Sequence, residues 1–220
     1  QNILLDFVEN SKTYNVYLPM LTFALSTALR IGEIIGLTWN DIDLKNNLIH
    51  VRRQLIYRDF GDGYKLHVEL PKSRSGNRDI SLTAIARKSL LKQKELDFVL
   101  GKRVKERPIE GIKGFVFITS NGTPILPFNF NDVLRNITNA YNKKESKLAA
   151  AEHREPILLP HITAHILRHT ACTRMAEAGM DPKILQGIMG HSDISMTMNV
   201  YNHGSIERMQ NEMKKLEKYM

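Results

Sequence analysis

The chain has a single cysteine, Cys172, among its 220 residues. One cysteine excludes an internal disulfide and suits a reducing compartment, so we expect a cytoplasmic protein. No apolar run reaches the roughly 20 residues that span a bilayer, and no signal peptide opens the chain. We therefore expect no membrane partner. Internal repeats and low-complexity stretches are also missing, which argues against repeat arrays and for one mixed domain.

Acidic residues are in the minority. The chain has 23 Asp and Glu against 31 Lys and Arg, which leaves a net charge of +8. Such an excess favours an anionic partner, with nucleic acid first, because the basic residues are clustered along the sequence. A protein that is basic without binding nucleic acid is the alternative on charge alone. The clusters are Arg52 with Arg53, residues 72–78, residues 102–107, and Lys143 with Lys144.

Hydrophobic periodicity predicts an α+β domain that is mainly helical. Turn-forming residues at 59–63 and 75–77 separate stretches rich in β-formers, which predicts a small three-stranded antiparallel sheet. The expected strands of that sheet are 48–57, 64–70 and 78–82, and a further short strand is expected at 115–118. The expected helices are 1–9, 17–31, 27–43, 83–100, 129–151, 163–179, 181–189 and 195–201.

The last segment carries a narrow apolar stripe on an otherwise polar predicted helix. Its members recur at intervals of three and four, which is the helical period. The stripe fits two arrangements, docking on the chain's own domain or on a neighbouring protomer. The apolar positions are Ile206, Met209, Met213, Leu216 and Met220.

Arginine, histidine and tyrosine residues near the two ends of the chain suggest chemistry on a phosphodiester. Arg30 lies in an apolar segment, where a charge must be paired or bind an anion. His165 and Arg168 are three residues apart, near the start of a predicted helix, where free N–H groups favour an anion. A chance surface pair is the alternative. An arginine fork stabilises charge on phosphate oxygens, and a phenol such as Tyr201 can take up the phosphoryl group covalently.

Histidines at a spacing of four raise the question of a metal site. His161, His165 and His169 could lie on one helix face. The zinc-protease motif requires a glutamate directly after its first histidine, whereas Ile166 follows His165. We therefore expect no metal and no other cofactor.

Four segments together resemble the tyrosine recombinase (phage integrase) family, in family order and spacing. Two departures are small: Ala28 replaces a frequent glycine, a change that a helix would tolerate, and Ile166 replaces a frequent aspartate. The character of the sequence is similar to integrases of conjugative elements and phages of low-GC bacteria. The matching segments are residues 27–33 followed by 37–43, then 165–170, 185–192 and 197–203, and the resemblance spans roughly residues 14–203.

The resemblance implies a catalytic role for six residues. Tyr201 would be the nucleophile that forms a 3′-phosphotyrosine, His165 its proton acceptor, and Lys72 the proton donor to the 5′ oxygen. Arg30 and Arg168 would clamp the phosphate, with a hydrogen bond from His191.

Further residues have supporting roles under the same resemblance. Glu33 would orient the catalytic groups, with a helix-surface carboxylate as the alternative. Lys72 could instead contact a phosphate, and Arg74 and Arg78 are its basic rivals. The residues expected to contact DNA are Arg52, Arg53, Arg74 and Arg78.

The family also implies the surroundings of the enzyme. Residues 1–220 would be the catalytic domain, with 1–203 as its core and 204–220 as a tail helix on a neighbouring protomer. The start at Gln1 suggests a piece of a longer protein, without the arm-binding and core-binding domains that precede this region in such integrases. The partner would be double-stranded DNA, exchanged through a four-way junction within a homo-tetramer, with an accessory DNA-bending or excision factor as a further candidate. A type IB topoisomerase and a non-catalytic DNA-binding module are the alternative functions.

Overall fold

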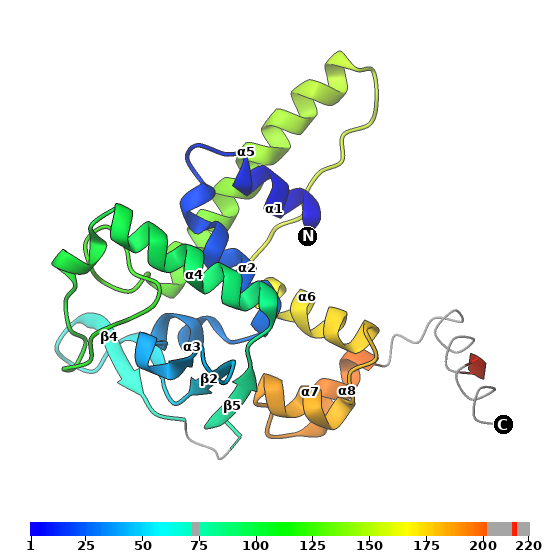
Figure 1. Ribbon diagram of the computed structural model, residues 1–220. Helices are drawn as coiled ribbons and strands as arrows, with labels where there is room; N and C mark the ends of the chain where they lie inside the picture. Colours follow the sequence, from blue (N-terminus) through cyan, green and yellow to red (C-terminus); the bar gives the residue numbers. More distant parts are fainter. Residues whose placement is uncertain (72–74, 202–212, 215–220) are drawn as a thin grey trace.

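The computed structural model describes residues 1–71, 75–201 and 213–214. Helices dominate, and the strands form two small antiparallel sheets (Figure 1). This architecture confirms the predicted α+β, mainly helical class. The α-helices are α1 (Asn2–Glu9), α2 (Leu18–Thr27), α3 (Ile31–Gly36), α4 (Ala84–Val99), α5 (Pro127–Ala151), α6 (Ala164–Glu177), α7 (Pro182–Met189) and α8 (Ile194–Tyr201). Short 3₁₀ turns are η1 (Asn15–Tyr17), η2 (Trp39–Asp41) and η3 (Lys102–Lys105). The strands are β1 (Ile42–Asp43), β2 (Leu48–Val51), β3 (Gln54–Asp59), β4 (Tyr64–Glu69) and β5 (Arg78–Ser81).

Helix α2 lies at the centre of the molecule and packs against both α4 and α6. Its buried side chains, among them Leu21 and Phe23, join those of the sheet and of α5 in one large core. A second, smaller cluster of buried residues joins Ala28 to α6 and α7 through short side chains such as Ala171. Small residues permit close approach of these segments, so the backbone at Ala28 comes near the helices that carry the carboxyl-terminal half of the site.

The sheet differs from the predicted one. The strand expected over 48–57 breaks at Arg52 and Arg53, and its halves belong to different sheets: β1–β2–β5 and the β3–β4 hairpin. The break follows from tertiary contacts, because the two arginines are held by different partners. Arg52 pairs with Asp79 of β5, whereas Arg53 pairs with Asp41 of η2. A three-stranded antiparallel sheet is present, but β1 takes the place that the sequence assigned to residues 64–70.

The strand expected over 115–118 does not form. Phe115 and Ile118 make isolated bridges to Thr38 and Pro124, and no ladder develops between them. The backbone N–H groups turn to unrelated acceptors, since that of Phe115 donates to the carboxylate of Glu106 and that of Val116 to the carbonyl of Leu37. The apolar run is buried, as its composition predicts, but as irregular backbone.

The helix predicted over 17–31 also ends early. Helix α2 stops at Thr27 because Ala28 adopts a left-handed backbone conformation, with φ of 54°. Glycine is the residue that adopts this conformation at least cost, so the expectation that alanine is harmless here as a helix residue is wrong. Arg30 thereby becomes the N-cap of the short helix α3 rather than the end of α2.

Helix starts were predicted more accurately. The side chains of Thr83 and Thr163 accept hydrogen bonds from backbone N–H groups of the first turns of α4 and α6. Asp181 does the same for α7, followed by Pro182 at its first position. These N-caps are among the strongest local signals in a sequence, because each satisfies N–H groups that the helix itself cannot.

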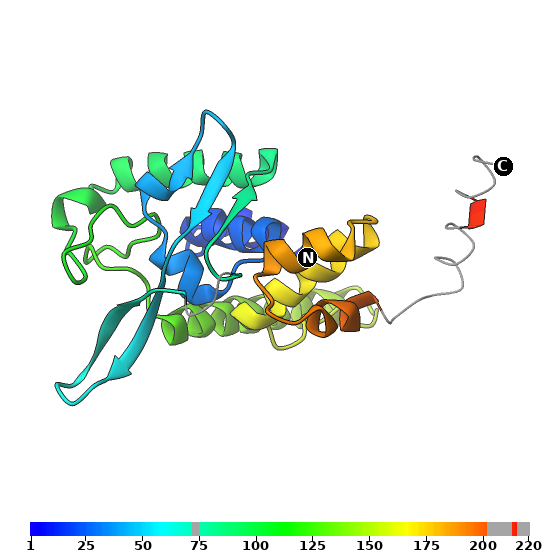
Figure 2. The same ribbon diagram turned by 90° about the horizontal axis from the view of Figure 1, so that it is seen from below.

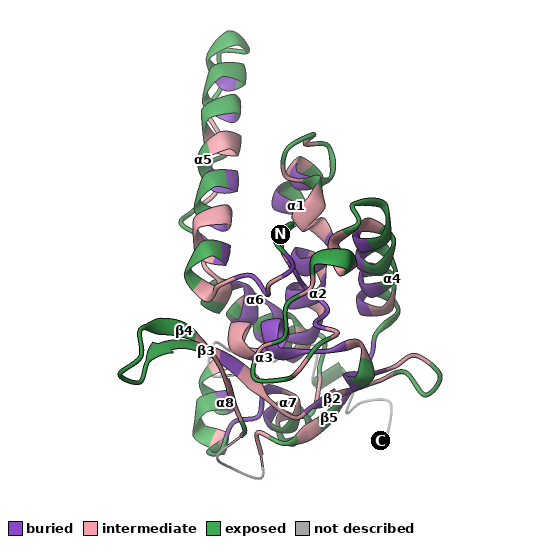
Figure 3. Ribbon diagram, turned by 90° about the vertical axis from the view of Figure 1, so that its left-hand side faces the viewer, coloured by how far each residue is buried: buried purple, intermediate pink, exposed green. Residues whose placement is uncertain are grey.

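Two elements project from the body of the molecule. The carboxyl-terminal end of α5 extends beyond the other helices and is largely exposed (Figures 1 and 3). The β3–β4 hairpin protrudes on a different side (Figure 2). In the part of the chain that the structure describes, no helix is both long and apolar enough to cross a membrane. Of the predicted tail stripe, only Met213 belongs to the described residues.

Candidate active site

Arg30 and Glu33 meet at the start of α3. The Glu33 carboxylate accepts a hydrogen bond from the Arg30 backbone N–H at 2.9 Å and one from its Nη1 at 3.1 Å. Both bonds run from Arg30 to Glu33, and together they satisfy the N-cap backbone N–H of α3 and fix the direction in which the arginine side chain leaves the backbone. The Arg30 side chain keeps 38% of its surface exposed, so its guanidinium remains accessible. The prediction that Glu33 orients a catalytic group gains a geometric basis, because the carboxylate is buried rather than on the helix surface.

Arg78 of β5 completes the environment of Glu33. Its Nη1 lies 2.9 Å from Oε1 of Glu33 and its Nη2 lies 3.0 Å from Oε2, a bidentate pair. Burial raises the pKa of Glu33, but the hydrogen bond and charge of Arg78, together with Arg30, outweigh this effect and hold the pKa below its usual value. Glu33 is therefore a carboxylate at neutral pH, between two guanidinium groups.

Arg168 is the buried arginine of the site. From α6 its Nη1 donates to the carbonyl of Ala28 at 2.8 Å, and its Nη2 donates to the carbonyl of Met189 at 2.7 Å. The left-handed turn at Ala28 is what aims that carbonyl at α6. Burial, together with the charge of Arg30, lowers the pKa of Arg168 to about 10, so the group stays cationic at neutral pH. This side chain joins the amino-terminal and carboxyl-terminal halves of the site.

His191 lies directly after α7 and contacts Arg168. Its Nε2 is 3.1 Å from Nη2 of Arg168, and its Nδ1 is 3.0 Å from Oγ1 of the buried Thr197. Burial and the charges of the three arginines lower the pKa of His191 to about 4. Since a guanidinium can only donate, Nε2 accepts, and the neutral ring carries its proton on Nδ1.

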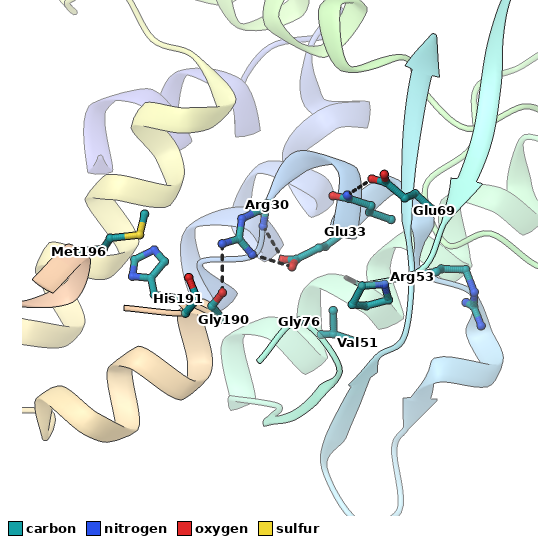
Figure 4. Close-up of a pocket in the computed structure, with 12 residues that line it drawn as sticks. Arg30, Glu33, Val51, Arg53, Glu69, Gly76, Gly190, His191 and Met196 are labelled. Carbon is teal, nitrogen blue, oxygen red and sulfur yellow. Dashed lines mark hydrogen bonds and ion pairs between the residues drawn. The ribbon is translucent and has the colours of Figure 1, made fainter. Parts of the chain in front are cut away.

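A cavity of about 370 Å³ opens beside these residues (Figure 4). Arg30 and His191 face it, Gly190 accepts a hydrogen bond from Nη2 of Arg30 at 3.2 Å, and Glu69 of β4 adds a second carboxylate. Two of the five N–H groups of Arg30 are used within the described structure, so the remaining donors are available to an anion. The other lining residues are Glu33, Val51, Arg53, Gln54, Pro71, Gly76, Ser192 and Met196.

Tyr201 lies at the end of α8, and its hydroxyl donates to the carbonyl of Met180, in the turn between α6 and α7. Its ring packs with the small cluster that contains Cys172 and Leu185. The phenol is half-buried in this position rather than directed into the cavity. The structure thus brings Arg30, Arg168 and His191 together and holds Tyr201 on a neighbouring surface.

His165 is exposed on α6, with its ring edge-on to that of His169 at a centroid distance of 4.6 Å. Burial, with the nearby His165, lowers the pKa of His169. Among the residues that the structure describes, no group of three or more His, Cys, Asp and Glu side chains could hold a metal ion. The expectation that the chain needs no metal stays a prediction.

The residues predicted to contact DNA occupy unlike positions. Arg52 is partly exposed and pairs with Asp79, and Arg53 is more buried and pairs with Asp41. Arg78 is 8% exposed and has inward partners, a position that differs from the predicted DNA surface. Lys72 and Arg74 lie outside the described residues, so the choice of Lys72 over its rivals stays a prediction.

Sequence reasoning missed three contributors to the site. Arg78 was taken for a DNA contact, although it binds Glu33. Thr197 was unremarked, and only its spacing of six from His191 could have drawn attention to it. The backbone carbonyls at the end of α7 were invisible because every residue has one, but Gly190 signals the helix end that exposes them.

Comparisons with known proteins agree on one family. The model described as "Phage integrase family" matches residues 2–208. The chain is 37% identical over 218 residues to the transposase from transposon Tn916 of Enterococcus faecalis, covering 98% of this chain and 49% of that protein. It is 29% identical over 193 residues to the tyrosine recombinase XerC-like protein of Caldanaerobacter subterraneus, covering 84% of this chain and 44% of that protein.

A solved structure of similar fold is that of the Tn1549 transposon integrase in complex with transposon right end DNA. It has a TM-score of 0.80 and 34% identity, with 97% of this chain and 63% of that chain covered. The chain spans about half the length of the curated relatives that it matches. With the family model covering nearly all of its residues, the chain belongs to the phage integrase family.

Proposed function

We propose that this chain is the catalytic domain of a tyrosine site-specific recombinase that integrates or excises a mobile element. The observation that carries the proposal is the convergence of Arg30, Arg168 and His191, with Glu33 beneath them, beside one cavity. They come from segments about 160 residues apart in the sequence, and together they favour a bound phosphate. The membership of the chain in the phage integrase family and its likeness to the Tn916 transposase support the same function.

The charges of the site suit the transition state of phosphoryl transfer. The three guanidinium groups of Arg30, Arg78 and Arg168 outnumber the two carboxylates of Glu33 and Glu69, so one net positive charge remains beside the cavity. Developing negative charge on the non-bridging oxygens would be stabilised by donors already in place, each worth about 10²–10³-fold in rate. Arg30 would bind the phosphate directly, with Arg168 fixing the backbone and His191 beside it.

The residues expected from the sequence account for every bond and proton that changes in the covalent step. The oxygen of Tyr201 forms a bond to phosphorus, and its proton passes to His165. The bond from phosphorus to the 5′ oxygen breaks, and Lys72 supplies the proton that this oxygen takes up. A 5′ hydroxyl of partner DNA then attacks the 3′-phosphotyrosine and reverses these transfers, so the bond is restored without an external energy source.

Tyr201 must leave Met180 for this reaction. Its hydroxyl is bound to a backbone carbonyl in the present conformation, which we interpret as a resting state. That hydrogen bond contributes about 0.5–1.5 kcal/mol net, and the packing of the ring with the small cluster adds to it. Contacts with DNA or with a neighbouring protomer would offset both. Rearrangement of α8 would bring the phenol to the cavity.

The substrate that we propose is double-stranded DNA. The excess of basic residues favours it, and the structures of the Tn1549 integrase are described as complexes with transposon end or circular intermediate DNA. A homo-tetramer that exchanges strands through a four-way junction, an accessory DNA-bending or excision factor, and a cytoplasmic location complete the proposal. The tail over 204–220 would then dock on a neighbouring protomer, and arm-binding and core-binding regions would precede the catalytic domain in the whole protein.

The experiment that tests the proposal distinguishes transfer between two DNA molecules from relaxation of one. The chain is incubated with two labelled linear DNAs that carry candidate element ends and, separately, with supercoiled plasmid. We expect joined products that contain both labels and that vanish with Tyr201→Phe. Relaxation of the plasmid without joined products would indicate a type IB topoisomerase, and binding without either reaction would indicate a DNA-binding module.

A further inference from the structure

Arg78 stands at the junction of three elements that carry the site. Its guanidinium leaves β5 and meets both oxygens of Glu33 on α3, at 2.9 and 3.0 Å. Its Nε donates in addition to the carbonyl of Ile188 on α7, at 2.8 Å. A planar fork with a third donor at its side suits this set of acceptors, and a lysine ammonium cannot reproduce it.

The carbonyl of Ile188 is the first of three consecutive acceptors at the end of α7. Each of the three accepts a hydrogen bond from a different arginine. Ile188 accepts from Arg78 at 2.8 Å, Met189 from Arg168 at 2.7 Å, and Gly190 from Arg30 at 3.2 Å. The last carbonyls of a helix have no partner within it and carry partial negative charge, so the three cations stabilise this end.

Gly190 shows how closely Arg78 approaches. Its φ is 64°, and a Cβ built on it would lie 2.7 Å from Nη1 of Arg78. His191 follows directly, so the position of its ring depends on the same turn. The Arg78 guanidinium therefore holds Arg30 in position through Glu33. It holds His191 in position through the end of α7.

We propose that Arg78 is a positioning residue for phosphoryl transfer, acting through Glu33 and the end of α7 on Arg30 and His191. This role rests on the proposed function and replaces the direct DNA contact expected from the sequence. The 8% exposure of its side chain and its inward hydrogen bonds argue against a phosphate contact. A DNA contact would face solvent in the free protein, as Arg30 does.

The test compares Arg78→Met with Arg87→Met. Arg87 is a matched control because it also bonds to a backbone carbonyl and an amide, those of Leu44 and Asn47, away from the cavity. Cleavage of a DNA with a candidate core site and DNA affinity over a range of salt are measured for both. For Arg78→Met we expect cleavage to fall by about 10²-fold, the effect of a misplaced catalytic group. Affinity and its salt slope should match those of Arg87→Met.

Arg78→Lys extends the test and serves alone if Arg78→Met does not fold. It keeps the charge but loses the fork, and we expect its cleavage to stay at least about 10-fold below wild type. Glu33→Gln combined with an Arg78 variant should cleave no more slowly than the worse single variant, because the two side chains act as a unit. Cleavage by the Arg78 variants at the level of Arg87→Met would overturn the proposal. So would a salt slope reduced by about one, which is the mark of a lost phosphate contact.

Hydrogen exchange separates this inference from the proposed function. The backbone N–H of His191 donates to the carbonyl of Gln186, and the backbone N–H of Gly190 donates to the carbonyl of Gly187. Both amides should exchange faster in Arg78→Met or Arg78→Lys than in Arg87→Met, whether or not the wild type cleaves DNA. Unchanged exchange at both amides would show that Arg78 does not hold the end of α7. Absence of cleavage in the wild type would contradict the proposed function alone.

Discussion

Arg168 donates a hydrogen bond from Nη2 to Nε2 of His191 across 3.1 Å, and both side chains are buried. The contact joins α6 to the turn after α7, and burial together with the charge of Arg168 lowers the pKa of the imidazole so that it stays neutral. A neutral ring that accepts at Nε2 cannot donate from that atom to a phosphate. Donation to a bound phosphate therefore requires that His191 change its partner or gain a proton when DNA binds.

The low pKa of His191 predicts a loss of stability in acid. The folded value is about 4, against an ordinary value of 6.5. Between these pH values the unfolded chain binds a proton that the folded chain does not, so stability falls as pH falls through this window. At about 1.4 kcal/mol for each pKa unit, the loss is on the order of 3 kcal/mol.

Thermal unfolding of wild type and His191→Gln checks this expectation. As the pH falls from 7 to 4, the unfolding free energy of wild type should decrease more than that of His191→Gln. The same substitution at the exposed His161 is the control and should show no such shift. A pH-independent difference between wild type and His191→Gln would refute the neutral, buried imidazole.

Arg30 and Arg168, which the sequence resemblance predicts to clamp the phosphate, should differ in their effect on stability. Arg168→Ala leaves the carbonyls of Ala28 and Met189 without a donor inside the protein, at about 1–3 kcal/mol each. Arg30→Ala removes a half-exposed group, and Glu33 keeps Arg78, so the loss should stay near 1 kcal/mol or below. Both should reduce cleavage by about 10²-fold or more. Equal losses of unfolding free energy in the two variants, measured by urea denaturation, would contradict this division of roles.

Two glycines three residues apart should respond to alanine in opposite ways. Gly187 lies within α7 with nothing within 4 Å of an added Cβ, and alanine there should stabilise by about 0.5–1 kcal/mol. Gly190 has a left-handed backbone and meets Arg78, so alanine there should destabilise by more than about 1 kcal/mol. Melting temperatures of the two variants decide the matter, and a stabilising Gly190→Ala would show that the end of α7 is not tightly held.

DNA binding should weaken with salt at a slope of about −0.9 for each phosphate neutralised. The side chain of Arg52 is partly exposed and pairs with Asp79, whereas that of Arg78 is buried. Arg52→Gln is therefore expected to reduce the slope and Arg78→Lys to leave it unchanged, as fluorescence anisotropy can measure. A slope near zero for the wild type would mean that the basic residues do not form the DNA surface.

Local signals predicted much of the fold. Capping residues placed the starts of α4, α6 and α7, since Thr83, Thr163 and Asp181 satisfy backbone groups of their own helices. The sequence could not predict the break at Arg52 and Arg53, because their partners Asp79 and Asp41 are found only through tertiary contacts. For the same reason, the sequence could not predict that the strands before and after the break pair in different sheets.

The site was predicted in part. Motifs singled out Arg30, Arg168 and His191, which the fold brings together. They could not reveal that Ala28 adopts a left-handed turn, which directs its carbonyl to Arg168. They also suggested DNA contact for Arg78, because a basic residue in a basic segment is indistinguishable from a buried ion-pair partner until the acceptor is located.

The central claim is that Tyr201 attacks the scissile phosphate. Its most direct test is capture of the chain on DNA with a nick in a candidate core site, followed by tryptic mapping of the adduct. Cleavage after Lys183 and Arg208 yields a peptide over residues 184–208 in which Tyr201 is the single tyrosine. We predict that this peptide carries the DNA through Tyr201 and that Tyr201→Phe binds DNA without forming the adduct. An adduct on another peptide, or one that persists in Tyr201→Phe, would contradict the account.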